Sequence, residues 1–562
     1  MNKKETKYAH MVYTILSLAL IIILNSCIEK GSEIREDRQG LILNIAADAI
    51  VKYPDWDGEI VKKGAEFIAT GYNPDPDHLQ YYISSQQAVT ALRNYVDLYA
   101  NTQVTSLFFN INYQRACFDN KVMEPYWDVK EPEKSTSGWA RLHWILHEKG
   151  IDPYEICIDQ SRLKNISPWI SIRMNDHHYF DDSTKINKFM LDHPEYRKGP
   201  NGLFNYAIKE VRDFYKAFII EILDKYDVDG IELDWMRTHS IFNEGEVAEG
   251  TELINLFMKE IRELTNLKSQ QLNHPVRIAS RVPSSPEIGK SFGLDGVNWV
   301  QNNYVDILIP TNWHYPVNFD IPVEQWRNEI GEGYEYILAP GADAGRKSFR
   351  NQYHKTMLSN IESMLGFSAS AYNRGADAIY YFNNFDPVSR RKIVNPDGTV
   401  SITDDKQRIL KEAGKLSTVM NKPRCHLFSY KDPDIKSAST ASSKLPQGVK
   451  NEYSIHSGPK PEEGNYIIRI GLESLIGYED AILEVTLNEK PCQQIEDMPR
   501  DPAYKYDNTK KWEVVTNVSE TGARMMQFSA DLNEVKEGYN RIGITNNQKE
   551  EQEITWLEVY IN

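Results

Sequence analysis

Eight short apolar segments alternate with longer amphipathic segments between residues 41 and 385. The short segments are rich in β-branched and aromatic residues, as LILNIAA at 41–47 and VDGIELDW at 228–235 illustrate. Stretches between them, such as 208–226, carry apolar residues at helical spacing. This α/β alternation predicts parallel strands joined by helices, and eight strands favour a closed (β/α)8 TIM barrel over an open sheet. The expected strands are 41–47, 104–112, 166–173, 228–235, 276–282, 305–312, 334–341 and 376–385.

The pattern changes after about residue 421. Runs such as YIIRIGL at 466–472 and NRIGITN at 540–546 alternate apolar and polar residues, and no long helical segment accompanies them. Period-two alternation of this kind predicts an antiparallel, all-β sandwich. Its closing strands resemble those of jelly-roll carbohydrate-binding modules, although a sandwich that only stabilises the barrel fits equally well. The expected division is a catalytic domain at 28–422, a linker or long loop at 423–450 and a β-sandwich at 451–562.

The first 27 residues have the layout of an export signal. Three lysines lie among the first seven residues, and an apolar run at 11–24 leads into LNSC at 24–27. The ending resembles the lipobox of bacterial lipoproteins, which implies an acylated Cys27 and attachment to the membranes of the cell envelope. An ordinary signal peptide or a single membrane anchor remains an alternative.

Charge and motif content exclude several classes of function. The 562 residues include 64 Lys and Arg against 80 Asp and Glu, a formal net charge of −16. No basic cluster suited to nucleic acid is present. No glycine-rich phosphate loop follows a strand, and the cysteines form no CxxC pair, so we expect neither a nucleotide nor another cofactor. The oligomeric state is left open.

The fourth expected strand carries two acidic residues at alternate positions. Side chains alternate along a strand, so Glu232 and Asp234 share one face while Ile231 and Leu233 share the other. Two carboxylates directed into a barrel are costly unless they are paired or used. Hydrolysis of a glycosidic bond needs such a carboxylate pair. The alternative is that Glu232 only pairs with an arginine of the barrel.

Further polar residues follow other strands, where the active site of a barrel enzyme lies. Arg173 can form a forked contact with a carboxylate or with sugar hydroxyls. Of the adjacent His177 and His178, one should reach the site and the other should be structural. A metal site built from Asp176, these histidines and His314 lacks HxH or HExxH spacing, so no metal is expected. The expected substrate-binding residues are Arg173, Asp176, His177, Trp235, Arg237, Asn312, Trp313, His314, Asp343 and Asn383.

The stretch YDVDGIELD at 226–234 resembles the strand-four motif of glycosyl-hydrolase-like family 10, a group of barrel proteins distinct from the xylanase family ten. DHPEY at 192–196, ILAPG at 337–341 and GADAIYYF at 375–382 are similar to that family as well. The resemblance implies a barrel-fold glycosidase. The strand does not fit the D-x-x-D-x-D-x-E motif of family 18 chitinases, because Met236 and Arg237 stand where the acid would be.

Together these features predict a lipid-anchored glycoside hydrolase acting on a polysaccharide or oligosaccharide outside the cytoplasm. Asp234 is the expected principal catalytic carboxylate and Glu232 its partner, with Asp176 and Asp343 in reserve as the second acid. Two alternatives stay open. One is a glycan-binding lipoprotein without catalytic activity, and the other is a metal-dependent hydrolase of polysaccharide substituents.

Overall fold

The computed structural model describes most of the chain from Arg38 to Asn562. The predicted lipobox with Cys27, and His314 among the expected site residues, lie outside the described residues. The ranges not described are 1–37, 53, 55, 57–79, 81–82, 137, 181, 199–202, 314–316, 344, 350–354, 384–391, 395–399, 403–404, 430–440 and 511–512.

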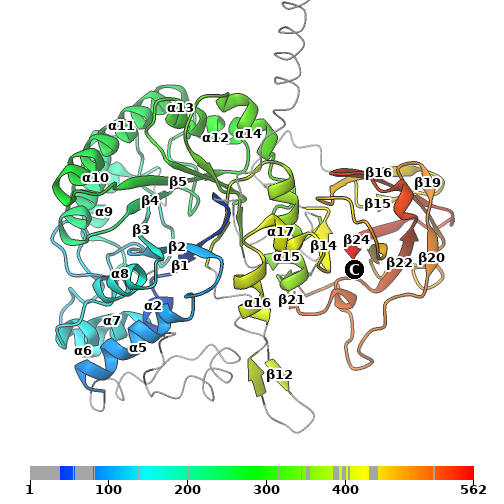
Figure 1. Cartoon of the computed structure of the whole chain (residues 1–562), viewed down its shortest axis with the longest axis horizontal. Helices are drawn as coiled ribbons and strands as arrows, with labels where there is room; N and C mark the ends of the chain where they lie inside the picture. Colours follow the sequence, from blue (N-terminus) through cyan, green and yellow to red (C-terminus); the bar gives the residue numbers. More distant parts are fainter. Residues whose placement is uncertain are drawn as a thin grey trace, which may run out of the picture. The chain divides into compact units, whose positions relative to one another are not determined.

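Parallel strands at eight positions close into a barrel, as predicted (Figure 1). The ring closes because the first strand pairs in parallel with both the second strand and the last. Two short strands, β7 and β8, share the seventh position, and both pair with β6. The strands are β1 (Leu41–Ile45), β2 (Val104–Asn110), β3 (Ser167–Arg173), β4 (Gly230–Asp234), β5 (Arg277–Pro283), β6 (Ile307–Thr311), β7 (Ile337–Leu338), β8 (Gly341–Ala342) and β11 (Ile379–Tyr381).

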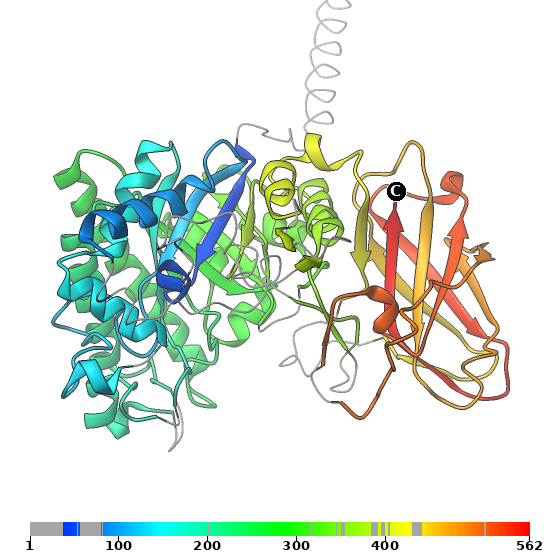
Figure 2. The same ribbon diagram turned by 90° about the horizontal axis from the view of Figure 1, so that it is seen from below.

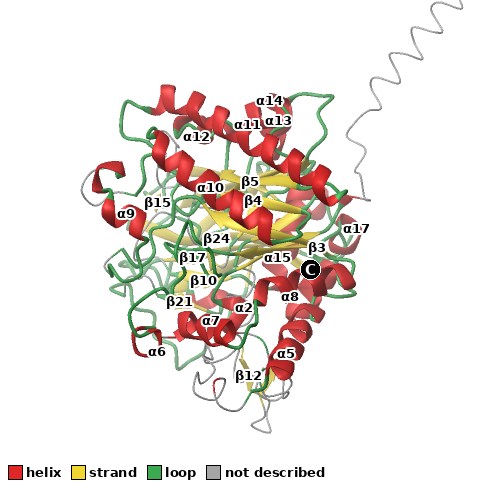
Figure 3. Cartoon of the chain, turned by 90° about the vertical axis from the view of Figure 1, so that its left-hand side faces the viewer, coloured by secondary structure: helices red, strands yellow, loops and turns green. Residues whose placement is uncertain are grey.

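Amphipathic helices surround these strands (Figure 3). In α10 (Lys209–Lys225), for example, Val211, Phe218 and Ile222 are buried on the face that the helical period predicts. None of the helices in the described ranges is both long and apolar enough to cross a membrane. The other helices are α2 (Ala49–Lys52), α5 (Ser85–Asp97), α6 (Pro132–Ser135), α7 (Gly138–Glu148), α8 (Pro153–Leu163), α9 (Lys188–Asp192), α11 (Val247–Leu272), α12 (Pro286–Ser291), α13 (Gly296–Gln301), α14 (Val323–Ile330), α15 (Ile361–Asn373), α16 (Asp405–Glu412) and α17 (Leu416–Val419).

Aromatic side chains fill the amino-terminal half of the barrel interior. The rings of Phe108 and Trp169 stack with their centroids 4.7 Å apart. Gly230 starts β4 beside them, and a Cβ atom there would lie 2.3 Å from the Trp169 ring. Ile42, Ala279 and Tyr380 belong to the same interior cluster. Glu232 and Asp234 follow Gly230 on the same strand, on the carboxyl-terminal side of this cluster.

The C-terminal region forms two antiparallel sheets with a shared apolar core, as predicted for a β-sandwich (Figure 2). One sheet has the order β14-β24-β17-β22-β20, with β15 also paired to β24, and the other has the order β16-β23-β18-β19. The strands are β14 (Arg424–Leu427), β15 (Lys444–Leu445), β16 (Lys450–His456), β17 (Tyr466–Leu472), β18 (Leu483–Leu487), β19 (Lys490–Pro491), β20 (Gln493–Ile495), β22 (Arg524–Ala530), β23 (Tyr539–Asn546) and β24 (Gln552–Ile561).

The expected linker at 423–450 is not wholly a linker. Strands β14 and β15 lie within it, and both pair with β24. These pairings satisfy backbone groups that a free linker would expose to water. Residues 430–440, between the two strands, lie outside the described residues.

Strand pairing and polar contacts connect the sandwich to the barrel region. Strand β10 (Thr356–Leu358) pairs with β9 (Gly345–Arg346) and, in parallel, with β21 (Val514–Val515). On α15, the Ser370 hydroxyl lies 2.8 Å from Nδ1 of His456. A separate hairpin pairs β12 (Lys392–Val394) with β13 (Val400–Ile402).

Candidate functional site

Asp234 ends strand β4 and is fully buried. Nη1 of Arg281, on the neighbouring strand β5, lies 3.3 Å from each of its carboxylate oxygens. The backbone N–H of Met236 donates to Oδ1 at 2.9 Å. A guanidinium and a backbone donor thus stabilise a negative charge at Asp234.

Arg281 is itself fixed on two further sides. Its Nε donates to the Thr311 hydroxyl, at the end of β6, at 3.1 Å. Its guanidinium carbon lies 3.7 Å from the centroid of the Phe382 ring, just after β11. The contact with Asp234 therefore has a defined geometry rather than that of a mobile surface pair.

Glu232 lies two residues deeper on the same face of β4. The Asn44 side-chain amide donates to its Oε2 at 3.1 Å and to the Ser171 hydroxyl at the same distance. Burial, and then the nearby charge of Asp234, raise the pKa of Glu232 to about 7. The hydroxyl groups of Ser171 and Tyr380 and the charge of Arg281 act in the opposite direction.

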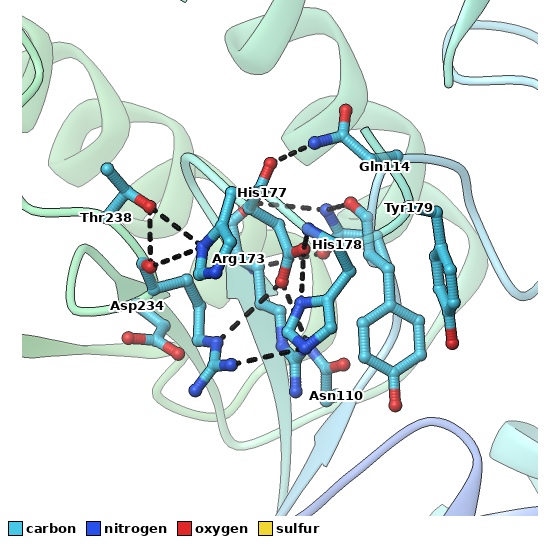
Figure 4. Close-up of polar contacts among 12 residues, drawn as sticks. Asn110, Gln114, Arg173, His177, His178, Tyr179, Asp234 and Thr238 are labelled. Atoms are coloured by element: carbon cyan, nitrogen blue, oxygen red, sulfur yellow. Dashed lines mark hydrogen bonds and ion pairs between the residues drawn. The ribbon is translucent and has the colours of Figure 1, made fainter. Parts of the chain in front are cut away.

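Asp176 follows β3, and its surroundings lower its pKa, whereas those of Glu232 raise it. Arg173 Nη1 donates to its Oδ2 at 2.8 Å, and the Oδ1 atom accepts both the backbone N–H and Nδ1 of His178 at 2.7 Å (Figure 4). Although burial opposes ionisation, Arg173 and His178 hold the pKa of Asp176 well below its usual range. These contacts favour the ionised form of Asp176, which suits a carboxylate better than a proton donor.

Arg173 ends β3 and is held by strand β2 and the loop after it. The Asn112 side chain accepts from the backbone N–H of Arg173 at 3.0 Å and donates to its carbonyl at 3.1 Å. The Tyr113 ring lies 4.2 Å from the guanidinium carbon, and its hydroxyl donates to Asp48 at 2.7 Å. The structure thus places Arg173 at the carboxyl end of β3, with its guanidinium group held on two sides.

Arg237, in the loop after β4, faces the same group. Its Nε lies 3.8 Å from Oδ2 of Asp176, and its Nη2 lies 3.5 Å from Nε2 of His178. Its guanidinium carbon is 5.1 Å from the centroid of the Phe382 ring. Arg237 therefore connects the Asp176 group to the Phe382 ring that packs on Arg281.

The two adjacent histidines have different surroundings, and His177 is the more exposed of the two. His178 meets Asp176 and Arg237, whereas Nδ1 of His177 lies 3.2 Å from the Arg237 carbonyl and 3.1 Å from the Thr238 hydroxyl. Asp176 accepts hydrogen bonds from both the backbone N–H and the ring of His178, so His178 is the histidine held in place at this loop, and His177 stays the predicted substrate-binding residue.

The prediction that Trp235 binds substrate is wrong. Trp235 is fully buried and packs against Tyr206, Phe257 and Trp299, with ring centroids 5.2, 6.3 and 6.5 Å away. Alternation along the strand is the reason: Glu232 and Asp234 point into the barrel, so the next residue points outward to the helices.

The remaining expected residues lie at other strand ends. Asn312 and Trp313 directly follow β6, and the Trp313 ring makes an edge contact with His239 at 5.2 Å. Asp343 follows β8, and its charge acts on Arg281. Asn383 follows the barrel's last strand, in a left-handed conformation with φ of 45°.

Several contributing residues were not predicted. Asn44, Ser171 and Tyr380 surround Glu232, and Tyr113 supports Arg173. A single Asn within the apolar LILNI of β1 is a signal that could have identified Asn44. Across the described ranges, no group of three or more His, Cys, Asp or Glu residues is placed to hold a metal ion.

No family model matches the chain, so the resemblance to glycosyl-hydrolase-like family 10 rests on its motifs. A search of curated proteins finds no match either. Solved structures to which the chain is similar include the chitinase ChiW of a Paenibacillus species, with a TM-score of 0.37 and 9% identity over 92% of this chain. The alignment covers 53% of ChiW, so the chain spans about half the length of that protein.

Two further structures show the same level of likeness. A family GH18 chitinase from Chromobacterium violaceum has a TM-score of 0.36 and 8% identity, over 93% of this chain and 91% of that one. A GH36 α-galactosidase from Geobacillus stearothermophilus has a TM-score of 0.33 and 9% identity, over 91% and 56%.

Proposed function

We propose that the chain is a glycoside hydrolase whose reaction takes place at the carboxyl end of the barrel. One observation carries the proposal: two carboxyl groups on the same face of β4 have opposite electrostatic environments. Arg281 and the Met236 N–H both contact the Asp234 carboxylate, while burial and the charge of Asp234 raise the pKa of Glu232 to about 7. A pair of titratable groups whose environments push them apart is the usual arrangement of an acid and a base in one site.

The chemistry of glycoside hydrolysis matches such a pair. The bond between the anomeric carbon and the leaving oxygen breaks through a transition state with positive charge on the sugar ring. The Asp234 carboxylate supplies the facing negative charge, and Glu232 supplies the proton that the leaving oxygen takes up. Water then adds its oxygen to the anomeric carbon, and its proton returns to the carboxylate pair. Asp176 has no part in proton donation, because Arg173 and His178 keep it ionised.

Both carboxyl groups are buried, so a sugar must move the groups above them. The Phe382 ring lies against the guanidinium groups of Arg281 and Arg237, and it follows the last strand of the barrel. We infer that substrate binding displaces this ring.

The test is a screen of the purified protein against a panel of polysaccharides and oligosaccharides, with release of reducing ends as the readout. Three proteins are compared: the wild type, Asp234→Asn and the control Asp224→Asn. Asp224 has a side chain 70% exposed, paired with Lys268 at 3.5 Å. Activity in the wild type and the control but not in Asp234→Asn supports the proposal. Glycan binding without turnover in all three supports the non-catalytic alternative instead.

We also propose that the chain is an exported lipoprotein, attached to the cell envelope through Cys27. The support is the sequence alone: the basic start, the apolar run and LNSC at 24–27. Stable attachment requires more than one acyl chain, which lipidation of this kind provides. Replacing Cys27 with Ala should move the protein from the membrane fraction to the soluble fraction, and unchanged membrane association would reject the assignment.

A further inference from the structure

Three arginines converge on the mouth of the barrel, and they are not equally neutralised. Arg173 has a carboxylate oxygen of Asp176 at 2.8 Å, and Arg281 has both oxygens of Asp234 at 3.3 Å. Among the described residues, no carboxylate oxygen lies within hydrogen-bond distance of Arg237. Its nearest recorded carboxylate oxygen, on Asp176, is 3.8 Å away and is already bound by Arg173.

The Arg237 side chain is only 14% exposed, so water compensates little of this deficit. Its Nε has no hydrogen-bond partner among the described residues, and the same is true of Nε of the buried Arg173. Burial and the neighbouring Arg173 charge lower the pKa of Arg237. A buried cation without an anion of its own is costly, which is why such groups mark binding sites.

We propose that the mouth of the barrel binds an acidic sugar and that Arg237 holds its carboxylate or sulfate group. The inference rests on the proposed function in taking the ligand to be a sugar. A guanidinium forms a planar fork of donors that matches two oxygens of a carboxylate or a sulfate. An anion at Arg237 would complete the hydrogen bonding and the charge balance that the protein leaves incomplete there.

The surroundings of Arg237 suit a sugar rather than a free anion. His178, whose ring lies 3.5 Å from Nη2 of Arg237, is followed by Tyr179, and the Trp139 indole donates to the Tyr179 hydroxyl at 3.2 Å. Tyr179 has φ of 61°, a left-handed conformation that costs free energy for a residue other than glycine. The half-buried Tyr179 ring lies next to that of His178, with the two centroids 5.9 Å apart, and so offers an apolar face for a sugar whose acidic group reaches Arg237.

The net charge of the chain indicates that any attraction for an acidic sugar is confined to the site around Arg237. With a formal net charge of −16, the protein as a whole repels anionic polymers. Selectivity for an acidic sugar must therefore come from direct contacts at the site, and these are short-range and specific.

Calorimetric titration measures binding of an acidic sugar and does not require turnover. A lack of acidic-sugar binding and a lack of hydrolysis are therefore distinguishable results. The probes are galacturonate, galactose 6-sulfate, galactose and inorganic sulfate. The wild type should bind at least one of the two acidic sugars about tenfold or more tightly than galactose. Binding of one acidic sugar and not the other tells which acid the site takes.

Variants of Arg237 assign the contact. Arg237→Gln should remove the preference for the acidic sugar, and Arg237→Lys should keep part of it, since lysine retains the charge without the fork. Arg541→Gln is the matched control, because Arg541 is 59% exposed and its nearest acidic partner is 3.8 Å away. Thermal unfolding of each variant establishes that it is folded.

Several results would overturn the inference. They are equal affinity for galactose and its acidic counterparts, no saturable binding of either acidic sugar, or an acid preference that survives in folded Arg237→Gln. Inorganic sulfate binding as tightly as galactose 6-sulfate would show a site for free anions and would reject the sugar.

Discussion

The buried ion pair between Arg281 and Asp234 should stabilise the barrel measurably. The side chains are 2% and 0% exposed, and the guanidinium lies 3.3 Å from the carboxylate. At that distance and an effective dielectric constant of about 20, Coulomb's law gives an attraction of about 5 kcal/mol. Removing one partner leaves the other buried and unpaired, so Arg281→Met should cost about 3–5 kcal/mol.

A double-mutant cycle isolates the pair. Asp234→Asn removes the charge that Arg281 compensates, so the double variant should be more stable than the sum of the two single losses by at least about 2 kcal/mol. Hydrogen exchange of amides in β4 and β5 is the assay, because it reports the free energy of local opening in a protein of several parts. A loss of 3 kcal/mol speeds exchange by about a hundredfold. Additive single effects, or an Arg281→Met loss below about 1 kcal/mol, would refute the reasoning.

Three further predictions concern packing and pH. Gly230→Ala should destabilise the barrel by about 2–3 kcal/mol in urea unfolding, because the new Cβ would lie 2.3 Å from the Trp169 ring; an unchanged midpoint would contradict this packing. Unfolding returns the pKa of Glu232 from about 7 to its ordinary value near 4.5, so the free energy of unfolding should fall as pH rises from about 4.5 to 7. In Glu232→Gln this fall should be smaller by a few kcal/mol over the whole range. The same fall in the variant and the wild type would reject the pKa shift. Burial lowers the pKa of His456 to about 4 from 6.5, so stability should fall as pH drops from about 6.5 to 4, and His456→Gln should lose that dependence when unfolding is measured across the range.

The barrel was predictable because each strand is an apolar run set between amphipathic helices. The division of the seventh strand into β7 and β8 has a local cause, since Pro340 lies between them and has no N–H to donate to the ladder. Strand β14 was missed because a four-residue strand has too little periodicity to identify. Its place in the sheet depends on pairing with β24, more than a hundred residues later.

In the candidate site, the alternation of side chains along a strand predicts only the residues that lie on the strand itself. Alternation placed Glu232 and Asp234 inside the barrel, and the same rule, applied one residue further, places Trp235 outside. Beyond the strand ends the backbone leaves that pattern, so the sequence does not show that His178 rather than His177 is held by Asp176. The pairing of Asp234 with Arg281 joins two strands, and no local pattern in the sequence encodes it.

The most direct test of the proposed activity is the turnover of Asp234→Asn on the best substrate from the glycan screen. Asn keeps the shape and the hydrogen-bonding reach of Asp but cannot carry the charge that faces the transition state. We predict a kcat at least about 10³-fold below that of the wild type, with the dissociation constant for the glycan changed by no more than about threefold. A kcat within about tenfold of the wild-type value would contradict the account and place the catalytic charge elsewhere.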